Sequence, residues 1–158
     1  MVSATLILIG SLALFLFYLQ AVCEQILRRR FEDPLPDPIV EANRLEFPFV
    51  RNALEEFDAP VDYTRFRVQL KCDYLALTYL LRNAANQSHR LSRSERLLAA
   101  YFGTLSLLLA VVHFLGMLEK PIFLKMTAVL EYFANELGER IKSVRFGNLS
   151  ASEYLMSL

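Results

Sequence analysis

The sequence predicts an all-α membrane protein, with two transmembrane helices, a helical soluble segment between them and an amphipathic helix after the second. Two runs, residues 1–23 and 97–118, contain no charged side chain. Each is as long as the stretch of about 20 apolar residues with which a helix crosses the hydrocarbon core. A helix satisfies its own backbone hydrogen bonds, so it is the structure expected for a single run that crosses lipid. Outside these runs, apolar residues recur at a spacing of three to four, which is typical of helices that bury one face.

The first transmembrane helix is expected at residues 1–23. The alternative is a cleaved secretory signal peptide, which carries basic residues before its apolar core and a small-x-small cleavage site after it. No Lys or Arg precedes the apolar stretch, and no such site follows Gln20. We therefore interpret this run as a membrane anchor that stays in the protein.

Residues 24–38 are expected to form a basic, proline-rich linker. It contains three consecutive arginines at 28–30 and a proline at every second position from Pro34 to Pro38. Prolines at this spacing cannot continue a helix and favour an extended, stiff chain. The linker is therefore expected to lead away from the membrane.

Residues 39–92 are predicted to be a helical soluble segment. Its first part, 39–58, is expected to be one helix or a broken pair, because Pro48 interrupts the apolar pattern. The clearest helix is expected at 63–86, with Asp62 as its N-cap. Its apolar stripe contains Phe66, Leu70, Tyr74, Leu77 and Leu81, widened by Val68, Leu75 and Leu80. The stripe is expected to pack on nearby residues of the chain or on a neighbouring subunit, and the pattern leaves both possibilities open.

The second transmembrane helix is expected at residues 93–118. Ser92 and Glu95 have the spacing of a capping box, which indicates where the helix begins. A strip of small residues runs along it, and small residues let helices approach closely in lipid. The strip consists of Ala99, Gly103, Ser106 and Ala110. It is therefore predicted to contact the first transmembrane helix or a helix of another protein.

Residues 119–158 are predicted to be an outer tail that contains an amphipathic helix. Pro121 suits the first turn of this helix, and Gly147 indicates its expected end. The apolar stripe consists of Ile122, Met126, Val129, Leu130, Phe133, Leu137, Ile141 and Val144. The polar face carries charges of both signs, which favours a protein partner over the headgroup region of the membrane.

The basic residues next to the two apolar runs predict the orientation. Arginines follow the first run at 28–30, and others precede the second run at 82, 90, 93 and 96. Lys and Arg favour the cytoplasmic side of a membrane helix. Residues 24–96 are therefore expected inside, and the N-terminus and the C-terminal tail outside. The membrane is expected to be a bacterial inner membrane or an organelle inner membrane.

We assign no residue to a catalytic, cofactor-binding or metal site from the sequence. The two cysteines, Cys23 and Cys72, match no zinc or redox spacing. The formal net charge of +0 provides no basic surface for nucleic acid, and no small-molecule substrate is evident. One residue, His113, is a candidate because ionisable groups in membrane helices are rare. Its imidazole is able to ligate a haem iron or a chlorophyll magnesium; the alternative is a neutral histidine bonded to another helix or lying near the interface.

Together these features predict a non-catalytic accessory subunit that braces a larger membrane protein complex of respiratory, photosynthetic or transport type. Its expected partners are the lipid bilayer and other integral membrane subunits, and no cofactor is expected. A first alternative is a haem- or chlorophyll-carrying membrane subunit that uses His113. A second is a self-associating membrane scaffold or regulator. A stand-alone enzyme or transporter ranks last, because two helices alone cannot line a gated path.

Overall fold

The structure is a computed structural model that describes residues 2–29, 40–41, 43–56, 62–83, 91–116 and 118–156, with side chains from Thr5 to Lys142 within these ranges. All regular secondary structure in these ranges is helical, which confirms the predicted all-α class. The helices are α1 (Val2–Leu27), α3 (Phe47–Glu56), α4 (Tyr63–Asn83), α5 (Arg93–Phe114) and α6 (Lys120–Met156).

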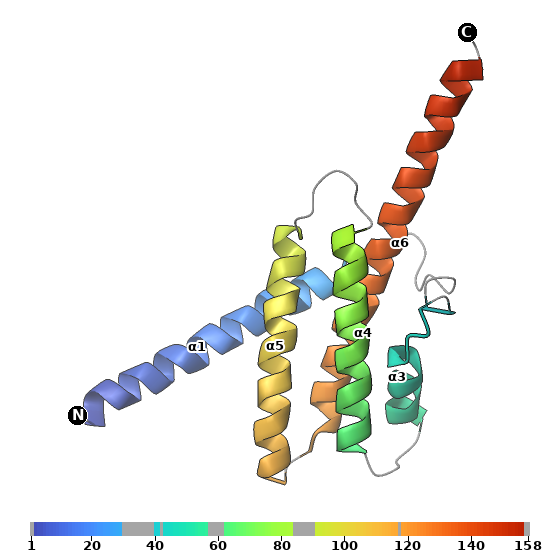
Figure 1. The fold of residues 1–158 in the computed structure, drawn as a ribbon. Helices are drawn as coiled ribbons and strands as arrows, with labels where there is room; N and C mark the ends of the chain where they lie inside the picture. Colours follow the sequence, from blue (N-terminus) through green and yellow to red (C-terminus); the bar gives the residue numbers. More distant parts are fainter. Residues whose placement is uncertain are drawn as a thin grey trace.

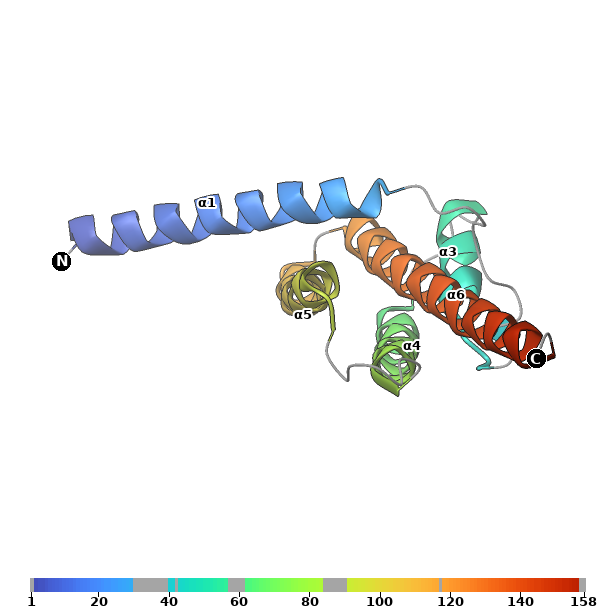
Figure 2. The same ribbon diagram turned by 90° about the horizontal axis from the view of Figure 1, so that it is seen from above.

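The helix α6 is the centre of the packing. It contacts each of the other four helices, while α4 and α5 stand beside each other and α3 lies against α4 and α6 (Figure 1). Viewed from above, α1 leaves the bundle with its N-terminal part away from the other helices (Figure 2). The C-terminal part of α6 also extends beyond the ends of the other helices (Figure 1). The structure therefore consists of a small bundle from which α1 and the end of α6 project.

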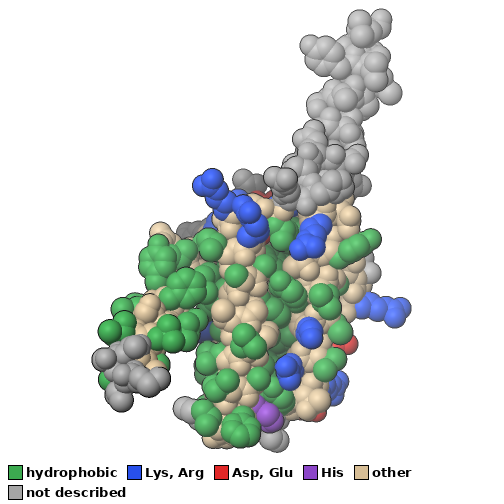
Figure 3. All heavy atoms as spheres, turned by 60° about the vertical axis from the view of Figure 1, so that its left-hand side comes forward, with side chains coloured by type: hydrophobic (Ala, Val, Ile, Leu, Met, Phe, Trp, Pro, Cys, Tyr) green, Lys and Arg blue, Asp and Glu red, His purple; other side chains and the backbone are tan. Residues whose placement is uncertain are grey.

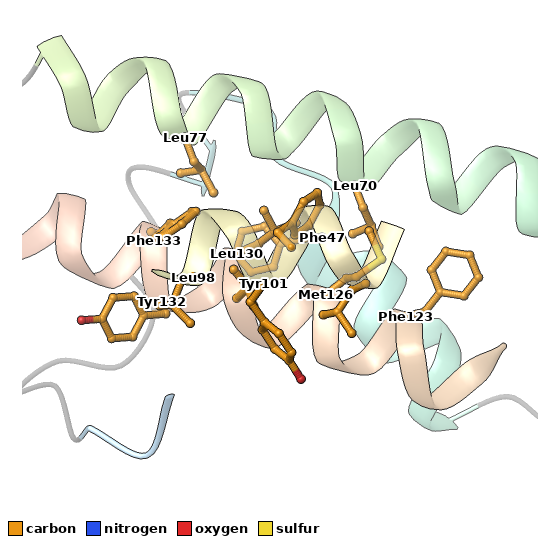
Figure 4. Close-up of a cluster of buried hydrophobic side chains, with 14 of the residues drawn as sticks. Phe47, Leu70, Leu77, Leu98, Tyr101, Phe123, Met126, Leu130, Tyr132 and Phe133 are labelled. Carbon is orange, nitrogen blue, oxygen red and sulfur yellow. The ribbon is translucent and has the colours of Figure 1, made fainter. Parts of the chain in front are cut away.

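The hydrophobic core lies where α3, α4 and α5 meet α6 (Figure 4). Its largest fully buried side chains include Phe47, Leu70, Leu77, Leu98, Phe123, Met126, Leu130 and Phe133. Tyr74 of α4 stacks on Phe102 of α5, with 4.3 Å between the ring centroids. Complete burial of a Leu or Phe side chain contributes about 1.5–3 kcal/mol, so the apolar stripe of α6 holds the bundle together.

The predicted capping box at the start of α5 is confirmed. The backbone N–H of Glu95 donates to Ser92 Oγ at 3.2 Å, and the backbone N–H of Ser92 donates to Glu95 Oε2 at 2.7 Å. The other end differs from the prediction, because the helix stops at Phe114 rather than at residue 118. Gly116 has a φ of 65°, a conformation that glycine adopts without steric cost, and the chain turns there towards α6.

Several other boundaries differ from the predicted ones. The helix α1 continues to Leu27, beyond the predicted end at residue 23. Pro48 stands in the first turn of α3, where a missing N–H costs nothing, so it marks a helix start rather than a kink. The proline-rich part of the predicted linker and residues 84–90 lie outside the described residues.

The predicted end of the tail helix near Gly147 is wrong. The helix α6 includes Gly147 and continues to Met156. Glycine in a helix interior costs about 1 kcal/mol relative to alanine, which is too little to end a helix by itself. The predicted stripe is confirmed from Ile122 to Leu137, where Met126, Leu130 and Phe133 are among its buried members. Ile141 is 43% exposed, so the stripe does not continue as predicted, and Val144 lies outside the described side chains.

The packing of α4 on α6 differs from the predicted membrane topology. The charge pattern assigns residues 24–96 and the tail to opposite sides of a membrane, which would separate α4 from α6. The structure packs α6 against both α3 and α4, so the two indications differ, and the side of the membrane on which each segment lies stays a prediction. Counting basic residues near helix ends takes no account of the apolar faces of α4 and α6, which bury each other.

Candidate interaction surface

Two described helices, α1 and α5, are long and apolar enough to cross a membrane by length and composition. Their surroundings differ. In α1, every described side chain from Thr5 to Tyr18 is exposed, and Leu19 is the first buried one. The part from Val2 to Tyr18 is about 26 Å long at 1.5 Å per residue. This length is close to the thickness of the hydrocarbon core, which is about 30 Å.

Beyond Leu19, α1 is attached to the bundle. Cys23 is completely buried, and its Sγ lies 4.0 Å from the backbone oxygen of Leu97 in α5. The carboxylate of Glu24 accepts a hydrogen bond from Lys125 Nζ of α6 at 3.3 Å. The exposed apolar part of α1 therefore ends where contacts with α5 and α6 begin.

Arg29, just after α1, adds a second attachment to α6. Its guanidinium lies 3.3 Å from a carboxylate oxygen of Glu136 and 3.2 Å from one of Glu139. The Arg29 side chain is about half exposed, and exposed ion pairs typically contribute up to about 1 kcal/mol. These pairs fix the direction in which α1 leaves the bundle more than they add to stability.

A buried ion pair joins the end of α4 and the beginning of α5 to the middle of α6. Glu95 in the first turn of α5 is completely buried and pairs with Arg140 of α6. Arg140 also donates to the backbone oxygen of Leu81, near the end of α4, at 3.1 Å. Glu136 lies one turn away, and burial raises the pKa of its carboxyl while the Arg29 guanidinium acts in the opposite direction. This cluster holds α4, α5 and α6 together at one end of the bundle.

Asp73 of α4 is a second buried carboxylate, and it holds the beginning of α3. Its Oδ2 accepts hydrogen bonds from the backbone N–H groups of Glu46, at 2.9 Å, and Phe47, at 2.7 Å. These N–H groups at a helix start have no partner within the helix itself. Burial raises the pKa of Asp73, and the two backbone hydrogen bonds act against that shift. We therefore assign Asp73 a structural role.

The sequence candidate His113 lies near the end of α5, beside the beginnings of α4 and α6. Its ring stacks on Tyr63 with 3.6 Å between centroids and 5° between planes. Its Nδ1 lies 2.5 Å from Glu119 Oε1. Among the described residues, no group of three or more His, Cys, Asp or Glu side chains is able to hold a metal ion. The contacts of His113 therefore join the end of α5 to the beginnings of α4 and α6.

The two cysteines lie apart and form no disulfide. Cys23 is buried between α1 and α5, and Cys72 is exposed on α4. In the small-residue strip of α5, Gly103 is exposed. At Gly103, an added Cβ would meet nothing within 4 Å, so the backbone of α5 is open at that point.

A hydrophobic surface extends over α1 and the outer face of α5, with basic side chains on the neighbouring surface (Figure 3). On α5 it consists of Leu97, Leu107, Leu108, Val111 and Phe114, all exposed. Exposed apolar surface that continues over two helices indicates contact with a protein or a membrane. This surface is the first candidate for interaction.

A groove between α4 and α5 is the second candidate. It has a volume of about 250 Å³, and we call it the α4–α5 groove. Its lining consists of Arg67, Lys71, Tyr74, Leu75, Phe102, Gly103, Ser106 and Met126. The sequence identifies the small residues on α5 but not this groove, because the groove depends on how far α4 stands from α5. The sequence pattern assigns Val68 and Leu75 to the apolar stripe of α4, but both side chains are exposed in the structure.

Comparisons with protein-family models, curated proteins and solved structures find no match to this chain. Its function is therefore inferred from its own residues and their geometry.

Proposed function

We propose that this chain is a small, non-catalytic accessory subunit that is anchored in a membrane by α1 and braces a larger membrane protein assembly of respiratory, photosynthetic or transport type. The observation that carries the proposal is the division of α1 at Leu19. An exposed apolar length that matches a bilayer is followed by a part held to the bundle by Cys23, Glu24 and Arg29.

In this proposal α1 alone crosses the lipid, and the outer face of α5 contacts a partner. One face of α5 is buried in the bundle, against helices that carry charged side chains. Exposed Arg67 and Lys71 of α4 lie across the groove from Gly103 of α5. If α5 stood at the centre of a bilayer, these side chains would enter it as well. A basic residue at that depth costs about 2.5–3.5 kcal/mol, which favours a protein partner over lipid on α5.

The two alternatives receive less support. Ligation of a haem or chlorophyll by His113 would have to be compatible with the Tyr63 ring stacked on the imidazole and with the Glu119 carboxylate at Nδ1. Self-association would use the same exposed faces as a foreign partner, and the basic side chains of Arg67 and Lys71 beside the groove disfavour pairing with the same face of a second copy.

The test is native mass spectrometry of the protein extracted in mild detergent from its own membrane, with every co-purifying chain identified. The proposal expects a stable assembly in which this chain is bound to other membrane subunits. A lone chain or a homo-oligomer would refute the accessory role and favour the self-associating scaffold. An absorbance band that disappears in His113→Ala would instead favour the cofactor-carrying alternative.

A further inference from the structure

We infer that the α4–α5 groove is the docking site for an amphipathic helix of a different protein, one that carries acidic side chains along its edge. The inference rests on the proposed function, which requires a protein partner but does not say where that partner binds.

The shape of the groove suits a helix. Its floor is apolar, because the stacked rings of Tyr74 and Phe102 lie beside Met126. On the α5 side the lining residues Gly103 and Ser106 are small, and the space beyond Gly103 is open. Small residues allow a second helix to approach closely enough for its side chains to reach such a floor.

The helix α4 carries a second apolar stripe that no described residue buries. Val68, Cys72, Leu75 and Tyr79 are all exposed. Their spacing of four, three and four residues is that of a coiled-coil seam, which packs against another helix. Leu75 belongs both to this stripe and to the lining of the groove. A regular seam beside a groove indicates a helix as the occupant, since an acyl chain has no need of such a repeat.

The charges around the groove indicate the chemistry of the partner. Arg67 and Lys71 are one helical turn apart and both line the groove, and no acidic residue is part of its lining. Complementary charge across an interface selects partners, and like charges facing each other cost several kcal/mol. A partner helix with Asp or Glu side chains along one edge would therefore complement the basic side chains of the groove.

The same charges disfavour a second copy of this chain as the occupant. A two-fold symmetric dimer uses the same patch on both subunits. Pairing groove with groove would bring Arg67 and Lys71 of both copies into one interface, with no carboxylate from the lining to compensate. A symmetric groove-to-groove dimer is therefore disfavoured, and the proposed occupant is a different chain, with a crosslink to a second copy as the outcome that would refute it.

The experiment is site-specific photo-crosslinking of the full chain in its native membrane, with benzoylphenylalanine in place of Leu75. The matched control carries the same residue in place of Phe49 on α3. The two positions are equally exposed, at 57% for Leu75 and 59% for Phe49, but Phe49 is not part of the groove lining. We expect Leu75 to crosslink to a helical segment of another protein that contains Asp or Glu, and Phe49 to give no crosslink to that segment.

A charge reversal completes the test. Arg67→Glu combined with Lys71→Glu is expected to lower the yield of the Leu75 crosslink at least about tenfold, since repulsive charges replace attractive ones. Arg65→Glu combined with Arg82→Glu changes the same charge on exposed residues of α4 outside the groove lining, and should change the yield by less than about twofold. Equal losses in both pairs would contradict a role for the groove charges.

The outcomes distinguish this inference from the proposed function. If the assembly co-purifies but Leu75 crosslinks to lipid, to a second copy of the chain or to nothing, the groove inference is refuted and the accessory role stands. If no assembly co-purifies, the accessory role is refuted, and the groove inference falls with it.

Discussion

Glu95 of α5 and Arg140 of α6 form an ion pair in which the Glu95 side chain is completely buried. The pair stands where α4 ends and α5 begins, because Arg140 also binds the backbone oxygen of Leu81. Removing one partner of a buried pair leaves an uncompensated charge in a poorly solvated place. This pair is therefore expected to be the most sensitive polar contact in the bundle.

The first prediction concerns this pair. Arg140→Met is expected to lower the free energy of unfolding by about 3–5 kcal/mol, because it leaves the Glu95 carboxylate buried and unpaired. The double variant Arg140→Met with Glu95→Gln is expected to lose less than the sum of the two single variants, because it contains neither charge. Urea unfolding of the full chain in detergent measures all three. Additive losses would show that the two side chains are not coupled.

The second prediction concerns Asp73. Asp73→Leu leaves the backbone N–H groups of Glu46 and Phe47 without their acceptor, and the loss of stability is expected to be about 1–3 kcal/mol. Asp73→Asn keeps an acceptor oxygen of similar shape and should stay within about 1 kcal/mol of the wild type. Hydrogen exchange at the Phe47 amide reports on the contact directly. Equal destabilisation by Leu and Asn would contradict the capping role.

The third prediction is a dependence on pH. Burial raises the pKa of Asp73 above its ordinary value of 3.8. The folded chain therefore holds this proton to a higher pH than the unfolded chain does. It follows that the contribution of Asp73 to stability falls as the pH rises from 3.8 through the folded-state pKa.

Asp73→Asn has no proton to lose in this window and is the matched control. The difference in unfolding free energy between the wild type and the variant is expected to move in favour of the variant across the window, and to be constant above it. Urea titrations of both proteins at a series of pH values measure this difference. A shift towards the wild type with rising pH would show that the hydrogen bonds from Glu46 and Phe47 outweigh burial.

The elements that the sequence predicts well depend on neighbours in the chain. The Ser92–Glu95 capping box needs only residues three apart, and the structure contains both of its hydrogen bonds. The buried stripe of α6 follows from the period of a helix. Gly147 does not end α6, whereas Gly116, just after α5, has the left-handed conformation that often follows a helix. The residue type alone does not distinguish a glycine that adopts this conformation from one that stays helical.

The features that the sequence does not predict depend on contacts between distant residues. Asp73 holds a helix start 26 residues away, and Arg140 binds a backbone oxygen 59 residues away. In the sequence, both are simply charged residues of amphipathic helices. The α4–α5 groove has the same origin, since it exists only once α6 has set the positions of α4 and α5.

The fourth prediction tests the anchor. Leu12 lies in the middle of the exposed part of α1 and is 57% exposed. Leu12→Arg is expected to weaken membrane insertion by about 2.5–3.5 kcal/mol, which moves much of the protein into the supernatant on carbonate extraction. Leu12→Ala keeps an uncharged helix and should remain in the pellet. Retention of Leu12→Arg in the pellet as efficiently as Leu12→Ala would indicate that α1 does not cross the lipid.

The fifth prediction discriminates between the packing of α4 on α6 and the topology expected from charge. The exposed thiol of Cys72 reports on α4, and Ile141→Cys, at a position that is 43% exposed, reports on α6. The two reporters are used in separate chains, both of which carry Cys23→Ser. The first keeps the native Cys72, and the second carries Ile141→Cys together with Cys72→Ser.

In sealed vesicles, a membrane-impermeant maleimide is expected to label both positions from the same side, because α4 and α6 are packed together. Val2→Cys, at the far end of α1, is the control and should be labelled from the opposite side. The basic residues before α5 predict instead that Cys72 and Ile141→Cys react from opposite sides. That result would mean that α5 crosses the membrane and that α6 separates from α4 when it does.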